Sequence, residues 1–167
     1  MKKLWTVLWI IIGRILYVLV WPLLYLYLRL GGERTRVVVT YKDNILLVQN
    51  WLGTGQWMLP GGGVYRHERP TNSAVRELKE ETGLKVRPHD LKFIGNANYK
   101  GKGLNIALVC YHLKLTIKPK LKIRRQLEVM NIKWVSLGRA LTKESITPDT
   151  RQMLELWNKH GGFEAAS

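Results

Sequence analysis

The first 30 residues are far more apolar than the rest of the chain. Between Leu4 and Leu28, 15 of 25 residues are Leu, Ile or Val, and Arg14 is the only charged residue. As a helix this segment is roughly 37 Å long, enough to cross a hydrocarbon core of about 30 Å. The aliphatic residues contribute roughly −0.3 to −0.6 kcal/mol each, which outweighs the cost of about 2.5 to 3.5 kcal/mol for one arginine. We therefore predict one transmembrane helix in residues 1–30, with residues 4–28 in the bilayer.

Two other interpretations of this segment are weaker. A cleaved signal peptide is disfavoured because the apolar run is too long and no small-x-small cleavage site follows it. A helix lying in the membrane interface is disfavoured because the segment is apolar nearly all round. Lys2 and Lys3 precede the segment, whereas Arg29, Arg34 and Arg36 follow it. The excess of positive charge after the segment favours a single-pass protein whose C-terminal domain is cytoplasmic.

Beyond Gly31-Gly32 the pattern is that of a folded domain. We predict a linker at 31–36, a domain at 37–160 and a tail at 161–167. The predicted strands are the apolar or alternating runs 37–41, 45–49, 91–99, 104–115 and 131–137. The predicted helices run from about residue 70 to Gly83, and from Pro148 to about Lys159. Strands before, between and after two helices indicate a mixed α/β sandwich.

Net charge and cysteine content narrow the classes of binding partner and exclude some kinds of cross-link. After position 30 there are 23 basic and 12 acidic residues, a formal charge of +11. This balance favours anionic partners, either a polyphosphate substrate or lipid headgroups. The basic run 114–125 is either a solvated strand edge or a juxtamembrane contact. No recognised nucleic-acid module is present, so we expect no specific nucleic acid partner. Cys110 is the only cysteine, which excludes an internal disulfide, and we expect it in the core.

The most informative feature is a crowded set of carboxylates in the first predicted helix. Glu77, Glu80 and Glu81 are related by i,i+3 and i,i+4 spacing, so three negative charges share one face and repel each other. A hard divalent cation with oxygen ligands would relieve that repulsion. The glycines at 61–63 precede this helix, where they are either a flexible turn or a place where backbone approaches phosphates closely.

The stretch from Gly62 to Leu84 resembles the signature of the Nudix hydrolase family. The matching positions are Gly62, Glu68, Arg76, Glu77, Leu78, Glu80, Glu81, Gly83 and Leu84. The resemblance covers roughly residues 34 to 160 and implies an α/β/α sandwich with a mixed sheet. It also implies that Glu80, Glu81 and the Gly61 carbonyl ligate Mg²⁺, with Mn²⁺ as an alternative.

The same resemblance implies roles for the remaining signature residues. Glu77 is a metal ligand or the general base, Arg76 orients it, and Glu68 supports the metal site, together with Gly62 and Gly63. Each residue also has a simpler interpretation. Arg76 can form an ordinary i,i+4 ion pair with Glu80, and Glu68 can favour the positive end of the helix.

A second candidate base and three candidate substrate contacts lie outside the signature. Glu128 stands six residues before Trp134, as does a metal-site glutamate in nucleotide-sanitising members of the family. It could equally be an acid that relieves the basic run beside it. Trp57, Asn98 and Tyr99 could stack on or hydrogen-bond a nucleobase, although aromatic residues of a small sandwich often serve its core.

The resemblance therefore implies a magnesium-dependent hydrolase that cleaves the diphosphate linkage of a nucleoside diphosphate joined to another moiety. The predicted anchor keeps open a second substrate class, a lipid-linked or prenyl diphosphate at the membrane. The alternative from another class is a non-catalytic, membrane-tethered module that binds a nucleotide. Degenerate family members of that kind usually lack one or more of the glutamates, and here all are present.

Overall fold

The computed structural model describes residues 12, 13, 15, 18–20, 22, 32–50, 55–101, 104–123 and 128–163. Most of the predicted anchor at 4–28 lies outside this part of the chain, as do the last four residues of the predicted tail. Within the described residues, no helix combines the length and the apolar character needed to cross a membrane. The anchor therefore stays a prediction.

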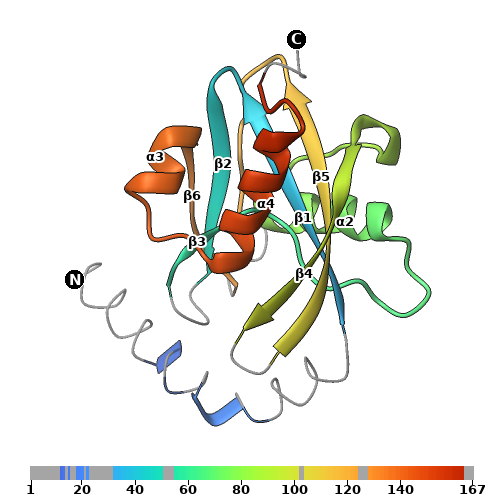
Figure 1. Cartoon of the computed structure of the whole chain (residues 1–167), viewed down its shortest axis with the longest axis vertical. Coiled ribbons are helices and arrows are strands. Elements are labelled where there is room, and N and C mark those ends of the chain that lie inside the picture. Colours follow the sequence, from blue (N-terminus) through green and yellow to red (C-terminus); the bar gives the residue numbers. More distant parts are fainter. Residues whose placement is uncertain are drawn as a thin grey trace.

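A six-stranded mixed sheet forms the centre of the domain (Figure 1). The strands are β1 (Glu33–Tyr41), β2 (Asn44–Asn50), β3 (Trp57–Met58), β4 (Lys92–Gly101), β5 (Leu104–Leu115) and β6 (Val129–Ser136). Their order is β3-β2-β1-β5-β4, and β6 pairs with β2 over its whole length, Asn44–Asn50. The β1–β5 pair is parallel and the other pairs are antiparallel. The predicted mixed sheet is confirmed.

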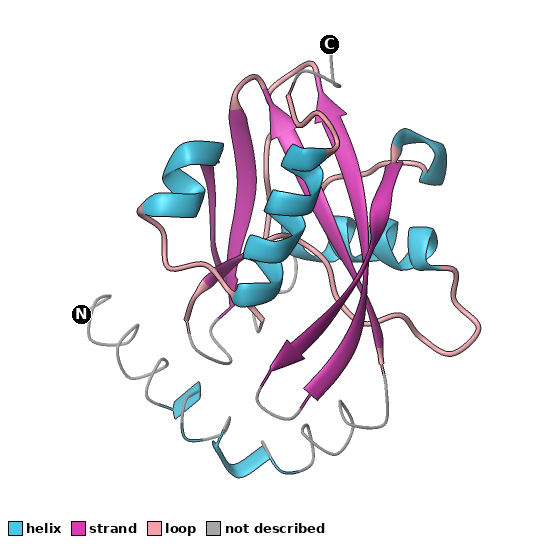
Figure 2. Cartoon of the chain, in the orientation of Figure 1, coloured by secondary structure: helices cyan, strands magenta, loops and turns pink. Residues whose placement is uncertain are grey.

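Helices cover both faces of this sheet (Figure 2). Helix α2 (Pro70–Thr82) lies behind the sheet in this view and α4 (Pro148–Lys159) lies in front, while α3 (Leu137–Thr142) packs near β6. A 3-10 turn, η1 (Pro88–Asp90), precedes β4.

Side chains alternate between the two faces along each strand, which divides the core into two clusters. Val37 and Val39 of β1 pack with Ala74 and Leu78 of α2. The cluster on the α4 side contains Val38, Leu108, Cys110, Met153 and Trp157. Cys110 is fully buried, as expected, and the layers are those of an α/β/α sandwich.

Two predicted boundaries are wrong. Strand β1 begins at Glu33, so four residues assigned to the linker belong to the sheet. Three of these four side chains are charged, so an apolar pattern does not detect the strand there, although pairing begins at once between Glu33 and Ala107 of β5. The tail also begins later than predicted, because the Phe163 ring packs edge-on against Trp157 at 4.9 Å between centroids.

Strands β1 and β2 pair over a short stretch only, and the loop that contains Gly61, Gly62 and Gly63 (the glycine loop, residues 60–64) pairs with the rest of β1. The two strands pair only at the Thr40–Ile45 and Tyr41–Asn44 positions. Nearer the start of β1, the same edge pairs instead with residues 60–64. The N–H groups of Thr35 and Val37 donate to the carbonyls of Gly62 and Pro60, both at 2.9 Å. The loop is thereby held in the centre of the sheet, beside α2.

Candidate active site

The α2 carboxylates differ in how deeply they are buried. Glu77 and Glu81 are 5% and 2% exposed, whereas the Glu80 side chain is 30% exposed. The helix carries them to the glycine loop, where Glu81 Oε2 accepts the Gly61 N–H at 2.9 Å. It ends as predicted at Gly83, which has φ 78° and donates its N–H to the Lys79 carbonyl. Two of the three acids therefore stand at the loop in a poorly solvated position.

The charges of two other carboxylates reach Glu81. Burial raises the pKa of Glu81 to about 8, and the charges of Glu77 and Glu128 shift it in the same direction. The Gly61 N–H and the charge of Arg36 oppose this shift. Glu128, which the signature does not include, is thus brought into the field of the α2 acids, and positive charge placed here would be stabilised.

The first two glycines of the loop have no room for a side chain. A β-carbon on Gly61, whose φ is 138°, would lie 2.2 Å from the Thr35 carbonyl oxygen. A β-carbon on Gly62 would lie 2.4 Å from Glu77 Oε1. At Gly63 a β-carbon would meet no atom within 4 Å. The loop is therefore a close approach of backbone to the acids, and the flexible-turn interpretation fails at Gly61 and Gly62.

Arg76 clamps the signature acids together. It donates to both oxygens of Glu68 at 3.0 Å, to Glu77 Oε1 at 2.6 Å and to the Gly63 carbonyl at 2.8 Å. Its contact with Glu80 is longer, at 3.5 Å. The bidentate pair lowers the pKa of Glu68 through the hydrogen bonds from Arg76. Arg76 thus holds Glu77 and Glu68 directly, and the i,i+4 pair with Glu80 is its longest contact.

The residues present fit a hard divalent cation. Within the described ranges, no three His, Cys, Asp or Glu side chains already stand together as a ready-made ion cage. Each acid is instead occupied by a donor, since Glu77 binds Arg76 and Glu81 binds the Gly61 N–H. The donor set is nevertheless all oxygen, close to backbone, and includes a carboxyl whose ionisation burial opposes. These are the properties of a site for Mg²⁺ or Mn²⁺.

Sequence reasoning missed Arg36 and Asp149. Arg36 is 4% exposed, and its Nε donates to Asp149 Oδ2 at 2.7 Å while its Nη1 donates to the Gly61 carbonyl at 2.7 Å. The available signal was an arginine inside a strand of Thr and Val residues, where a charge is costly unless paired. Its partner is 113 positions away and could not be read from the sequence.

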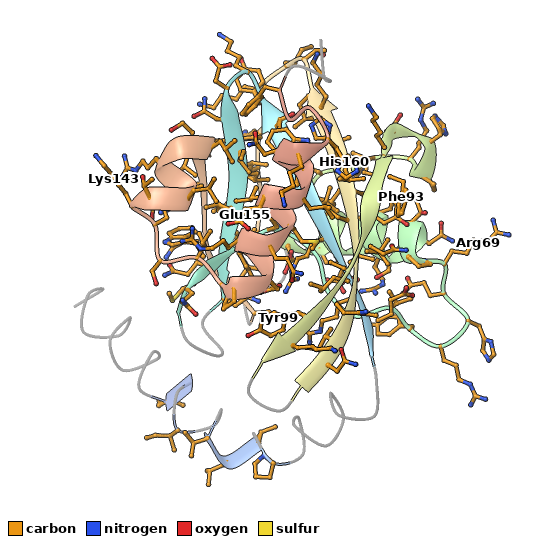
Figure 3. The ribbon with its side chains drawn as sticks, viewed as in Figure 1. Arg69, Phe93, Tyr99, Lys143, Glu155 and His160 are labelled. Atoms are coloured by element: carbon orange, nitrogen blue, oxygen red, sulfur yellow. The ribbon has the colours of Figure 1, made fainter. Side chains whose placement is uncertain are left out.

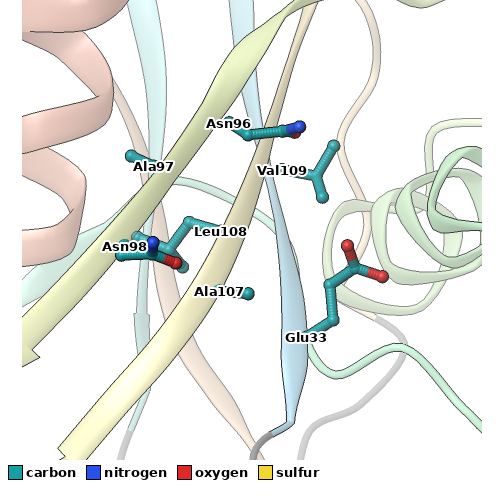
Figure 4. A pocket seen from close by; sticks show the side chains of 7 residues that line it. All are labelled: Glu33, Asn96, Ala97, Asn98, Ala107, Leu108 and Val109. Carbon is teal, nitrogen blue, oxygen red and sulfur yellow. The ribbon is translucent and has the colours of Figure 1, made fainter.

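The predicted substrate residues are not brought into contact with the acids by any hydrogen bond or ion pair among the described residues. Trp57 packs against the α4-side core, and Lys133 Nζ lies 3.8 Å from the centre of its ring. Tyr99 packs against the same core and lies near the lower end of α4 in Figure 3. Asn98 lines a cavity of about 270 Å³ with Glu33 and Asn96 (Figure 4).

The sequence matches the family model described as NUDIX domain over residues 32–157. The chain belongs to the NUDIX domain family. Diphosphoinositol polyphosphate phosphohydrolase 2 of Mus musculus is 46% identical over 44 residues, which are 26% of this chain and 25% of that protein. The Homo sapiens protein of the same name gives the same identity over 24% of its length. The chain thus spans about a quarter of the length of these curated relatives.

Solved structures of this family share the fold. The MutT NUDIX hydrolase from Burkholderia pseudomallei has a TM-score of 0.66 and 19% identity, covering 75% of this chain and 97% of that one. The NUDIX domain of Shewanella oneidensis NrtR, complexed with ADP ribose, has a TM-score of 0.64 and 20% identity, with 78% and 86% covered. A bifunctional NMN adenylyltransferase/ADP ribose pyrophosphatase from Francisella tularensis, complexed with AMP and a manganese ion, reaches 0.69 at 19% identity, with 86% and 46% covered.

Proposed function

We propose that the protein is a magnesium-dependent hydrolase that cleaves the diphosphate linkage of a nucleoside diphosphate joined to another moiety. One observation carries this proposal: Glu77 and Glu81 are both buried against the glycine loop, which in turn has no room for a side chain at Gly61 or Gly62. An arrangement that excludes side chains and concentrates carboxylates is costly for the fold and useful for binding a cation together with phosphate oxygens.

Each residue then has a role in the reaction. Glu80, Glu81 and the Gly61 carbonyl would hold the cation, which when bound shields phosphate oxygens and lowers the pKa of a bound water. Arg76 keeps Glu77 in place. Glu128 is our candidate for the general base, because its charge acts on Glu81 at the loop although it lies outside the signature helix. The products are a nucleoside monophosphate and the phosphorylated remainder of the substrate.

The substrate is a polyanion. The positive balance of the chain after position 30 supports this class, as do the names of relatives that act on diphosphoinositol polyphosphate or are complexed with ADP ribose. The cavity beside Asn98 offers amide and carboxylate groups for hydroxyls of the non-transferred moiety. Trp57 and Tyr99 remain candidates for stacking at the rim of the core.

Phosphate release from a mixed panel of nucleoside diphosphate derivatives tests the proposal. We expect turnover that requires Mg²⁺ or Mn²⁺, stops with EDTA and is lost in Glu81→Gln. A wild-type chain that turns over no compound of the panel in either metal would overturn the proposal, and binding without turnover would favour the non-catalytic module.

A second candidate substrate is a lipid-linked or prenyl diphosphate, because residues 4–28 have the length and apolar character of a membrane anchor. Tethering would raise the encounter rate with a substrate in the bilayer. The test compares turnover of soluble nucleotides with turnover of lipid diphosphates by the full chain in liposomes. Protease protection in the same membranes tests the proposed cytoplasmic orientation of the domain.

A further inference from the structure

A buried ion pair joins α4 to the glycine loop. Arg36 of β1 points to the α4 side of the sheet, where its guanidinium reaches Asp149 in the first turn of α4 at 2.7 Å. The same guanidinium donates to the Gly61 carbonyl oxygen at 2.7 Å. The side chains of Arg36 and Asp149 are only 5% and 15% exposed. One side chain therefore links the first turn of α4 to the Gly61 carbonyl oxygen, which is a cation ligand in the proposed function.

Arg36 also lies within the field of the α2 acids. Burial alone would lower its pKa, and the charges of Asp149, Glu81 and Glu77 raise it instead. Burial alone would raise the pKa of Asp149, and the charge of Arg36 lowers it. Both members of the pair are thus ionised, and the pair as a whole is neutral.

This geometry separates two effects on a cation at the loop. A carbonyl oxygen has two lone pairs, so the hydrogen bond from Arg36 fixes the direction of the Gly61 carbonyl and leaves one lone pair for another partner. A guanidinium so near a cation site would repel the cation strongly if it stood alone. Asp149, in direct contact with the guanidinium, offsets that repulsion.

We propose that Arg36 is a positioning residue for the cation site, which fixes the Gly61 carbonyl, and that Asp149 cancels the charge Arg36 would otherwise direct at the cation. This inference rests on the proposed function for the identity of the cation. It concerns binding and not turnover.

The test measures Mn²⁺ binding to the full chain by titration calorimetry and by the loss of the free-ion signal in electron paramagnetic resonance. Arg36→Met combined with Asp149→Leu removes the pair while keeping the site neutral, and replacing a buried pair with apolar side chains is often tolerated. We expect this double variant to melt within a few degrees of wild type in EDTA and to bind Mn²⁺ about fivefold or more weakly. A purely structural role would lower the melting temperature and leave the affinity of the folded protein unchanged.

Two single variants separate the effect of the Gly61 carbonyl direction from the effect of the Arg36 charge. Asp149→Asn leaves the Arg36 charge uncompensated, so Mn²⁺ affinity should fall about tenfold at low salt while the Gly61 contact survives. Arg36→Lys keeps the charge but reaches only one of the two partners, so its affinity should be more than about twofold weaker than wild type and no weaker than that of the double variant. Arg139→Met is the matched control, because Arg139 pairs with Glu144 at 3.0 Å near α3 and should leave Mn²⁺ binding unchanged.

The outcomes are distinct. Mn²⁺ affinity within twofold of wild type in the double variant, or in Arg36→Lys if the double variant does not fold, overturns the positioning role. Affinity equal to or above wild type in Asp149→Asn overturns the charge compensation. A wild type that binds no Mn²⁺ overturns both. Wild type that binds Mn²⁺ but hydrolyses nothing overturns the proposed function and leaves this inference standing.

Discussion

The α-carbon of Gly62 lies so close to Glu77 that a methyl group at position 62 would stand 2.4 Å from Oε1 and 2.5 Å from Cδ of that carboxylate. The next residue, Gly63, has open space at the same point. Two adjacent glycines of the same loop therefore differ in whether a side chain there would push the carboxylate away.

Gly62→Ala is expected to reduce activity without unfolding the protein. The atoms in conflict are the far end of a flexible side chain, so Glu77 can move at little cost to stability, but a displacement of about 1 Å can cost on the order of 100-fold in rate. We expect kcat/KM to fall about tenfold or more and the melting temperature to change by a few degrees at most. Gly63→Ala is the control and should keep both values. Equal activity in the two variants would contradict the assignment of Glu77 to the site.

Glu81→Gln should separate activity from stability. The amide keeps an oxygen for the Gly61 N–H but removes an ionisable group whose charged form burial disfavours, as the raised pKa of about 8 indicates. Hydrolysis in Mg²⁺ should fall by about two orders of magnitude or more, since charge neutralisation at the phosphate is lost. Thermal unfolding in EDTA should show a melting temperature no lower than that of wild type. Retention of full activity would remove Glu81 from the metal site.

Comparing Glu128→Gln with Glu77→Gln identifies the general base. A general base typically contributes about 10²–10⁴-fold, so the variant that lacks it should lose that much kcat with little change in KM. We expect this result for Glu128→Gln, and for Glu77→Gln a loss that is accompanied by weaker Mn²⁺ binding. A loss of less than about tenfold in Glu128→Gln would assign the base to Glu77 instead.

The elements of this fold were predictable where their pattern was local. Helix α2 ends at Gly83 and β5 spans 104–115, as its spacing and alternation indicate. The signature also implied a side-chain contact between Arg76 and Glu77, and the Arg76 guanidinium donates to Glu77 Oε1. The start of β1 was missed because its partners are far apart in the sequence. The first residues of β1 are polar and pair with β5 and the glycine loop, so the local sequence does not predict that they form a strand.

The site was predictable to the same extent. Residue types and spacing identified the acids, but the reason for the glycines is a contact with Thr35 and Glu77 that only the packed structure contains. Arg36 and Asp149 were missed because an ion pair between a strand and a helix 113 residues later leaves no periodic trace.

The thiol of Cys110 is expected to be unreactive in the native protein. It is fully buried, and burial raises its pKa to about 12, so almost no thiolate forms at pH 8. Labelling with a thiol-specific disulfide reagent should be slow in buffer and complete in denaturant. Because the sequence has a single cysteine, the signal has one source. Labelling in buffer at the rate of a free thiol would contradict the burial of Cys110.

His112 should make the protein less stable as the pH falls. Its Nε2 is hydrogen-bonded to Thr40 Oγ1 at 2.9 Å, and burial, aided by the charges of Lys92 and Lys114, lowers its pKa from 6.5 to about 4. Since the folded pKa is below the unfolded one, the unfolded chain binds the proton first. Stability is therefore complete above pH 6.5 and is lost as the pH falls from 6.5 to about 4.

The loss from His112 amounts to at most about 3 kcal/mol. Urea unfolding of the wild type and of His112→Gln at several pH values between 4 and 7.5 measures it. Glutamine lowers stability at neutral pH, but it cannot be protonated, so the difference between the two proteins should shrink as the pH falls. Carboxylates that titrate in the same range affect both proteins alike and cancel in this difference. A difference that stays constant across the range would mean that the His112 ring accepts its proton as readily in the folded chain as in the unfolded one.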